Sequence, residues 1–194
     1  MKLRLPKWLL EFTGNTYLCK QPMFFHYKPA HHKVNGKEVR MILEAIQPGD
    51  ILLRRYDGYL NSILTTLSSG SFWGHAAIAI SGDTVVHAVS QGVIYEDILE
   101  FSRCDSLAVL SVKGITPTQR HDAVNIACQF VGQKWEYDYR FERGNGKLYC
   151  TEVADSCHNG IFYDEFSMEM GNFLLTPDNI FNSEHVEKVL VIKH

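Results

Sequence analysis

Two short apolar runs, 75–80 and 84–89, are separated by the loop signal Ser81-Gly82-Asp83, and this arrangement predicts a β-hairpin. Loop length fixes the register of such a hairpin. A three-residue loop places His75 and His87 on one face as diagonal neighbours, whereas a one-residue slip would put them on opposite faces. The hairpin therefore predicts an antiparallel sheet on which two imidazoles lie within reach of each other.

The rest of the chain continues this pattern of short strands with few helices. Further strands are predicted at 50–54, 92–98, 107–112 and 188–192, and helices at 38–46, 58–67, 116–132, 150–160 and from Thr176 onward. Thr116-Pro117 and Thr176-Pro177 are helix starts, because threonine caps the N-terminus and proline fits the first turn. The expected fold class is α+β, with an antiparallel sheet of about five or six strands packed against a few helices.

Length and composition limit the domain organisation and the partners. The chain has 194 residues, 45% of them hydrophobic, and a net charge of -3. That length suits one domain, and the charge does not favour binding to nucleic acid or to an anionic membrane surface. No apolar run reaches the roughly twenty residues of a membrane span, so we expect no integral membrane association. We expect a domain at 37–194, preceded by an aromatic-rich extension, 1–36, that packs on the domain or forms a homodimer.

The cysteines indicate a compartment. There are five of them, and none has CxxC spacing, which argues against a disulfide scaffold and a structural zinc knuckle. Trp8-Leu9-Leu10 follows basic residues, but this apolar run is too short for a secretory signal. Reduced thiols and the lack of an export signal predict a cytoplasmic protein.

Cys150 has the strongest indication of chemistry. The turn signal Gly144-Asn145-Gly146 precedes it and a helical pattern follows, so Cys150 is expected in the first turn of a helix. Free backbone N–H groups and the helix dipole there favour thiolate and predict a lowered pKa. A nucleophilic cysteine also needs a base and a group that orients the base, and His75 and His87 could supply both. The alternative is a buried structural cysteine.

Short motifs in sequence order resemble the NlpC/P60 superfamily of papain-like cysteine hydrolases. The likeness is to its circularly permuted YiiX/YebB-like branch, which is akin to lecithin retinol acyltransferase-like enzymes. In that branch, as in this chain, the histidine strand precedes the cysteine helix. The resemblance spans about Ile46 to Pro177, and its motifs are Pro48-Gly49-Asp50-Ile51-Leu52, Gly74-His75-Ala76-Ala77-Ile78, Val86-His87-Ala88, Gly92-Val93, Tyr137-Asp138 and Leu148-Tyr149-Cys150-Thr151-Glu152.

The resemblance implies a cysteine hydrolase that acts through a covalent acyl-enzyme. It implies Cys150 as nucleophile, His75 as general base and His87 as the third, orienting residue. The third position varies across the superfamily, so Glu96 in the next predicted strand is the reserve. The resemblance does not explain the N-terminal extension.

The substrate class follows from the same resemblance. We expect a small-molecule, peptide or acyl substrate with an amide, ester or thioester carbonyl, and no metal or organic cofactor. Tyr149 and Trp73 flank the nucleophile and the base and are expected to line the cleft and contact substrate. Two alternatives are a zinc site built from Cys150, His75 and His87, and a catalytically idle binding domain on the same fold.

Overall fold

The computed structural model describes residues 17–18, 21–22, 32–57, 70–141, 143–169 and 172–194. The predicted helix at 58–67 and most of the predicted extension, 1–36, lie outside this part. Of the extension, β1 (Tyr17–Leu18) pairs with β2 (Gln21–Pro22), and Val34 is buried, with its N–H donated to the Cys104 carbonyl.

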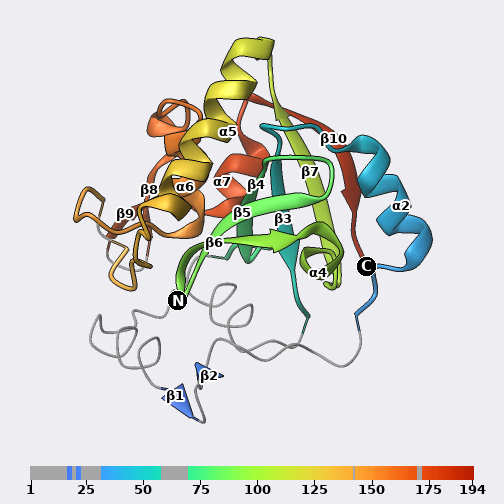
Figure 1. The fold of residues 1–194 in the computed structure, drawn as a ribbon, viewed down its shortest axis with the longest axis horizontal. Helices are drawn as coiled ribbons and strands as arrows, with labels where there is room; N and C mark the ends of the chain where they lie inside the picture. Colours follow the sequence, from blue (N-terminus) through green and yellow to red (C-terminus); the bar gives the residue numbers. More distant parts are fainter. Residues whose placement is uncertain (1–16, 19–20, 23–31, 58–69, 142, 170–171) are drawn as a thin grey trace.

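A six-stranded antiparallel sheet forms the centre of the molecule, in the order β10-β7-β3-β4-β5-β6 (Figure 1). Its strands are β3 (Ile51–Arg55), β4 (His75–Ala79), β5 (Thr84–Val89), β6 (Gly92–Asp97), β7 (Ser106–Val112) and β10 (Val186–Ile192). The α+β class and the predicted number of strands are thereby confirmed.

The hairpin of β4 and β5 has the three-residue loop that the sequence predicted. Ile78 pairs with Val86, and the Ile80 N–H donates to the Thr84 carbonyl, which leaves residues 81–83 as the loop. The same register continued along the strands sets His75 and His87 on one face as diagonal neighbours. The length of the loop therefore determines that the His75 and His87 side chains lie on the same face of the sheet.

Helices cover both faces of the sheet. On one face, α5 (Pro117–Gly132), α6 (Cys150–Cys157) and α7 (Pro177–Asn182) pack over Ile51, Ile78 and Leu110. On the other face, α2 (Gly36–Ala45) and the short α4 (Ile98–Phe101) pack over Leu52 and Val109. Figure 1 shows α5, α6 and α7 grouped on the side of the sheet away from α2. Because successive side chains of a strand point to opposite faces, β3 contributes to both cores.

Side-chain caps explain where the helices begin. The Thr116 and Thr176 side chains accept from the N–H groups of Gln119 and Asn179, and proline occupies the first turn of both helices. Asn35 caps α2 in the same way, with its oxygen accepting from the Glu38 N–H. The helix starts predicted from Thr-Pro pairs are confirmed.

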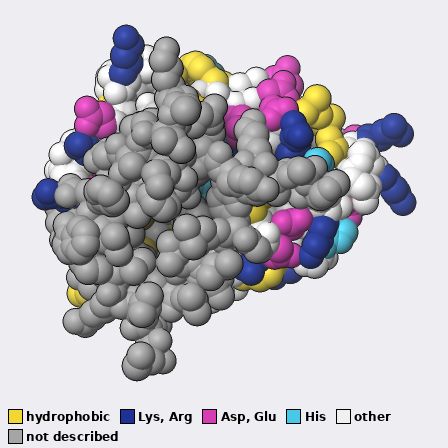
Figure 2. Space-filling model, turned by 90° about the horizontal axis from the view of Figure 1, so that it is seen from below, with side chains coloured by type: hydrophobic (Ala, Val, Ile, Leu, Met, Phe, Trp, Pro, Cys, Tyr) yellow, Lys and Arg dark blue, Asp and Glu magenta, His cyan; other side chains and the backbone are white. Residues whose placement is uncertain are grey.

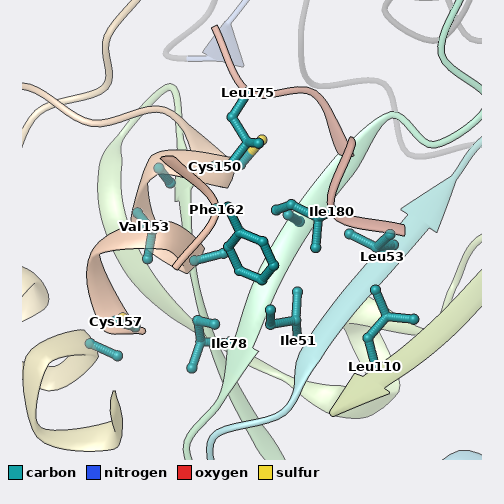
Figure 3. Packing of buried hydrophobic residues seen from close by; sticks show 14 of the residues in the cluster. Ile51, Leu53, Ile78, Leu110, Cys150, Val153, Cys157, Phe162, Leu175 and Ile180 are labelled. Carbon is teal, nitrogen blue, oxygen red and sulfur yellow. The ribbon is translucent and has the colours of Figure 1, made fainter. Parts of the chain in front are cut away.

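Small residues let α6 lie close to the sheet. Ala76 on β4 and Ala154 on α6 are fully buried in the same core. Phe162 follows the helix and is also fully buried, and Figure 3 shows its ring between α6 and the strands that carry Ile51 and Ile78. This packing sets the distance between the N-terminus of α6 and the start of β4.

Three features differ from the sequence interpretation. The β8 (Ser167–Glu169) and β9 (Asn172–Leu174) hairpin and helix α4 were not predicted, because elements of three or four residues show no usable period. The apolar pattern Ala123, Val124, Ala127, Cys128 and Val131 predicts that Cys128 lies in the core, but Cys128 is only partly buried, since Ala123 and Ala127 form the buried stripe of α5.

Phe162→Ala is expected to destabilise the fold by about 3–5 kcal/mol, because it removes a large buried ring and leaves a cavity under α6. Tyr163→Ala is the matched control, since that ring is 58% exposed. Urea denaturation of both variants measures the difference, and equal losses of stability would contradict the packing described for α6.

Candidate active site

Cys150 is the first residue of α6, as predicted, and it is 9% exposed. Its thiol lies against the start of β4, where the Ala76 backbone is a hydrogen-bond partner, and the backbone groups of Thr151 and Cys150 itself act in the same way. Ala76 is the residue after His75, so the packing of α6 on β4 brings nucleophile and base candidates to the same end of the sheet.

Burial dominates the protonation of this thiol. Desolvation raises the pKa of Cys150 to about 11, although the backbone hydrogen bonds and the charge of Arg54 act in the opposite direction. The lowered pKa expected from the helix N-terminus is therefore wrong for the structure as it stands. The helix dipole favours thiolate, but it does not offset the loss of water around sulfur.

The two histidines of the hairpin meet. His75 Nε2 lies 2.8 Å from His87 Nδ1, and the ring centroids are 5.1 Å apart. Desolvation, with a further contribution from the Arg54 charge, lowers the pKa of His75 well below its ordinary value. His75 is therefore a neutral imidazole at neutral pH, and its Nδ1 is the nitrogen that the contact with His87 leaves available.

A carboxylate and a guanidinium continue this line of side chains. Glu96 Oε2 lies 3.7 Å from His87 Nε2 and 2.9 Å from an Arg54 nitrogen. His87 thus lies between His75 and Glu96, so the structure places both candidates for the third position in one chain of contacts. The sequence did not identify Arg54 as a residue of the site, because nothing in the two adjacent arginines at the end of β3 indicates which side chain is buried.

Aromatic side chains surround the thiol. Desolvation raises the pKa of Tyr137 well above its ordinary value, and electrostatic coupling to Cys150 adds to the rise, which places the two groups near each other. Tyr149 is 2% exposed, and its hydroxyl accepts from the Leu175 N–H. Figure 3 shows Leu175 next to Cys150. Tyr149 therefore anchors the segment beside the nucleophile, and its contact with substrate stays a prediction.

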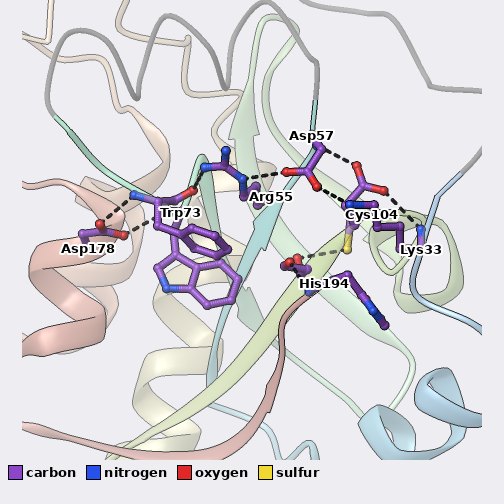
Figure 4. Close-up of polar contacts among 10 residues, drawn as sticks. Lys33, Arg55, Asp57, Trp73, Cys104, Asp178 and His194 are labelled. Atoms are coloured by element: carbon purple, nitrogen blue, oxygen red, sulfur yellow. Dashed lines mark hydrogen bonds and ion pairs between the residues drawn. The ribbon is translucent and has the colours of Figure 1, made fainter.

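Trp73 has a structural environment. It is fully buried, its ring packs against Phe181, and Asp178 accepts from the backbone N–H groups of Phe72 and Trp73 (Figure 4). These contacts hold the segment that leads into His75. The expected contact between Trp73 and substrate also stays a prediction.

Side chains of both charges occur on the face of the molecule shown in Figure 2. Acidic and basic side chains are interspersed among the described residues visible there. None of the described helices combines the length and the apolar character needed to cross a membrane. Within the described ranges, no three His, Cys, Asp or Glu side chains are grouped so that they could hold a metal ion.

A family model for permuted papain-like amidase enzymes of the YaeF/YiiX, C92 family matches residues 45–190. The chain belongs to this family. Among solved structures, the crystal structure of metalloprotein YiiX from Escherichia coli O157:H7 is similar, with a TM-score of 0.64 and 17% identity. The match covers 77% of this chain and 99% of that one, and at this identity it bears on the fold alone. No curated protein sequence matches the chain.

Alkylation of Cys150 by iodoacetamide is expected to be slow at neutral pH and to accelerate as pH rises toward about 11, because only thiolate reacts. With a pKa of about 11, roughly one thiol in 10,000 is ionised at pH 7. Peptide mass spectrometry across pH 5 to 10 measures this, with the partly exposed Cys128 as internal control. A plateau for Cys150 below pH 8 would contradict the neutral thiol.

Proposed function

We propose that the protein is a cysteine hydrolase that cleaves an amide or acyl bond through an acyl-enzyme on Cys150. The observation that carries the proposal is that the Cys150 thiol contacts the backbone of Ala76, the residue after His75, whose Nε2 lies 2.8 Å from His87 Nδ1. Family membership supports a papain-like amidase class. The roles below are our proposal for this chain.

The base works from a defined tautomer. If His87 carries its proton on Nε2, toward Glu96, its Nδ1 accepts from His75 Nε2–H at 2.8 Å. His75 Nδ1 then keeps a lone pair and takes the proton of Cys150 as sulfur attacks the carbonyl. His75 later gives that proton to the leaving group and activates the water that releases the acyl group.

The resting pair is neutral, and this shapes the mechanism. Burial opposes both a thiolate on Cys150 and an imidazolium on His75. Proton transfer therefore accompanies attack, and the charge that develops moves onto the carbonyl oxygen. Donors for that oxygen are the N–H groups at the start of α6 and the hydroxyl of the neighbouring Tyr137.

The site supports a chemical class of substrate. We propose a compact amide, ester or thioester, because sulfur attack requires a carbonyl and the described surroundings of Cys150 are aromatic and apolar. A cytoplasmic location fits the free thiols of Cys104, Cys128, Cys150 and Cys157.

The two alternatives make different demands on the site. The solved YiiX structure is described as a metalloprotein, but the nitrogens that a zinc ion would need from His75 and His87 face each other at 2.8 Å. The three side chains as placed therefore do not fit a zinc ion held by all of them together. An idle binding domain would leave Cys150 without reactivity toward acyl donors, which the next experiment tests.

Cys150→Ala is expected to abolish hydrolysis of a p-nitrophenyl acyl ester, and the wild-type protein should carry the acyl group on Cys150 when quenched early. Mass spectrometry of the α6 peptide locates the adduct. Cys128→Ala is the control and should keep wild-type turnover. Unchanged hydrolysis by Cys150→Ala would rule out the acyl-enzyme.

Tyr137→Phe is expected to lower kcat by about 10²-fold with little change in KM, since the hydroxyl would contact the oxyanion only as it forms. Tyr139→Phe is the matched control, because its hydroxyl donates to the Ser90 carbonyl. Steady-state kinetics on one ester separates the two parameters. An equal effect of both substitutions would remove Tyr137 from the oxyanion site.

A further inference from the structure

Arg54 is a buried cation beside the two histidines. It is 9% exposed and lies directly opposite His75 in the pairing of β3 with β4. A buried guanidinium is costly unless it is paired. Its short contacts are with Glu96 at 2.9 Å and with the Phe101 carbonyl at 3.4 Å. Arg120 forms a comparable ion pair elsewhere in the fold, with the buried Asp50 at 2.7 Å.

The Phe101 ring links Arg54 to both imidazoles. The guanidinium carbon lies 4.1 Å from the ring centroid, which is a cation–π contact. The same ring lies 6.2 Å from the His75 ring and 5.8 Å from the His87 ring, centroid to centroid. The Phe101 ring is therefore packed against the Arg54 guanidinium and both imidazoles. If Arg54 moved, Phe101 could move with it and both imidazoles would lose a packing partner.

We propose that Arg54 is a positioning residue for the histidine pair: it holds the Glu96 carboxylate against His87 and stacks on the ring that supports both imidazoles. The inference rests on the proposed function for its catalytic meaning, but its structural content can be measured without any substrate. The planar guanidinium suits this role, because it can donate hydrogen bonds to a carboxylate and stack on an aromatic ring at the same time.

Arg54 also acts through its charge. A positive charge near His75 disfavours the imidazolium and contributes to the lowered pKa of that residue. The charged or titratable groups that contact or influence His75 are Arg54 from β3 and His87 from β5, with Glu96 from β6 next to His87, whereas α4 presents the uncharged Phe101. Cys150 from α6 contacts the backbone of the following residue, Ala76. Removal of Arg54 should raise the pKa of His75, so that protonation on acidification begins at a higher pH.

The experiment follows the imidazole rings by ¹H–¹⁵N spectra in a pH titration, with His75→Gln and His87→Gln used for assignment. In Arg54→Gln, the titration of His75 is expected to move to higher pH and the His87 nitrogens to lose the single-tautomer pattern of the wild type. Arg54→Lys keeps the charge without the planar guanidinium, so it should hold the His75 titration near that of the wild type but alter the His87 pattern. Glu96→Gln should alter the His87 pattern and leave Arg54 in place.

Arg120→Gln is the matched control, because it breaks an ion pair with the buried Asp50 near the other end of β3. It should leave both imidazole patterns unchanged. Alkylation of Cys150 at fixed pH gives a second readout. We expect Arg54→Gln to slow it by about tenfold relative to Arg120→Gln, which is less than the roughly 10²–10⁴-fold of a complete general-base contribution, because Arg54 acts only through the histidines.

The outcomes separate this inference from the proposed function. Unchanged imidazole patterns in folded Arg54→Gln and Arg54→Lys would overturn the positioning role even if Cys150 proves essential for hydrolysis. Shifted patterns in a protein whose Cys150→Ala variant still hydrolyses ester would support the positioning role and reject the acyl-enzyme. If Arg54→Gln does not fold, Arg54→Lys and Glu96→Gln decide the question, and unaltered His87 patterns in both would overturn it.

Discussion

The close packing of α6 on β4 is the contact on which the rest of the structure depends. Ala76 and Ala154 have no bulk to hold helix and strand apart, so the first turn of the helix reaches the backbone next to His75. The other layers maintain that approach. Phe162 fills the space between the helix and the strands that carry Ile51 and Ile78, and the Thr151 hydroxyl donates to the Leu175 carbonyl, which fixes the start of α6. A larger side chain at position 76 would separate the two halves of the site.

The same packing has two opposing effects on the ionisation of the Cys150 thiol. Close contact excludes water, and the excluded water is what would otherwise stabilise a thiolate. Backbone N–H groups and the positive charge of Arg54 restore part of that stabilisation. The balance leaves a neutral thiol beside a neutral imidazole. Under the proposed mechanism, charge would be generated only as the reaction proceeds, at the carbonyl oxygen that the surrounding donors contact.

Local patterns predicted the parts of the fold that local chemistry decides. The loop at 81–83 fixed the hairpin register, and Thr-Pro pairs located two helix starts. The sequence could not show that Trp73 is fully buried, that Arg54 is the buried member of two adjacent arginines, or that Tyr137 lies near the thiol. Each of these depends on contacts between strands and helices distant in sequence. The pKa of Cys150 was mispredicted for the same reason, because the helix terminus is local and the desolvation is not.

The order of the segments has a consequence for how the protein is made. His75 and Cys150 are separated in the chain by β5, β6, α4, β7 and α5, so their approach closes a long loop. Joining distant segments has an entropic cost that grows with the length of the intervening loop, and folds rich in such pairings form slowly. During synthesis, the hairpin with both histidines emerges from the ribosome well before Cys150 does. Under the proposed function, a nascent chain would therefore carry its base without its nucleophile, and hydrolysis would begin only when the domain is nearly complete.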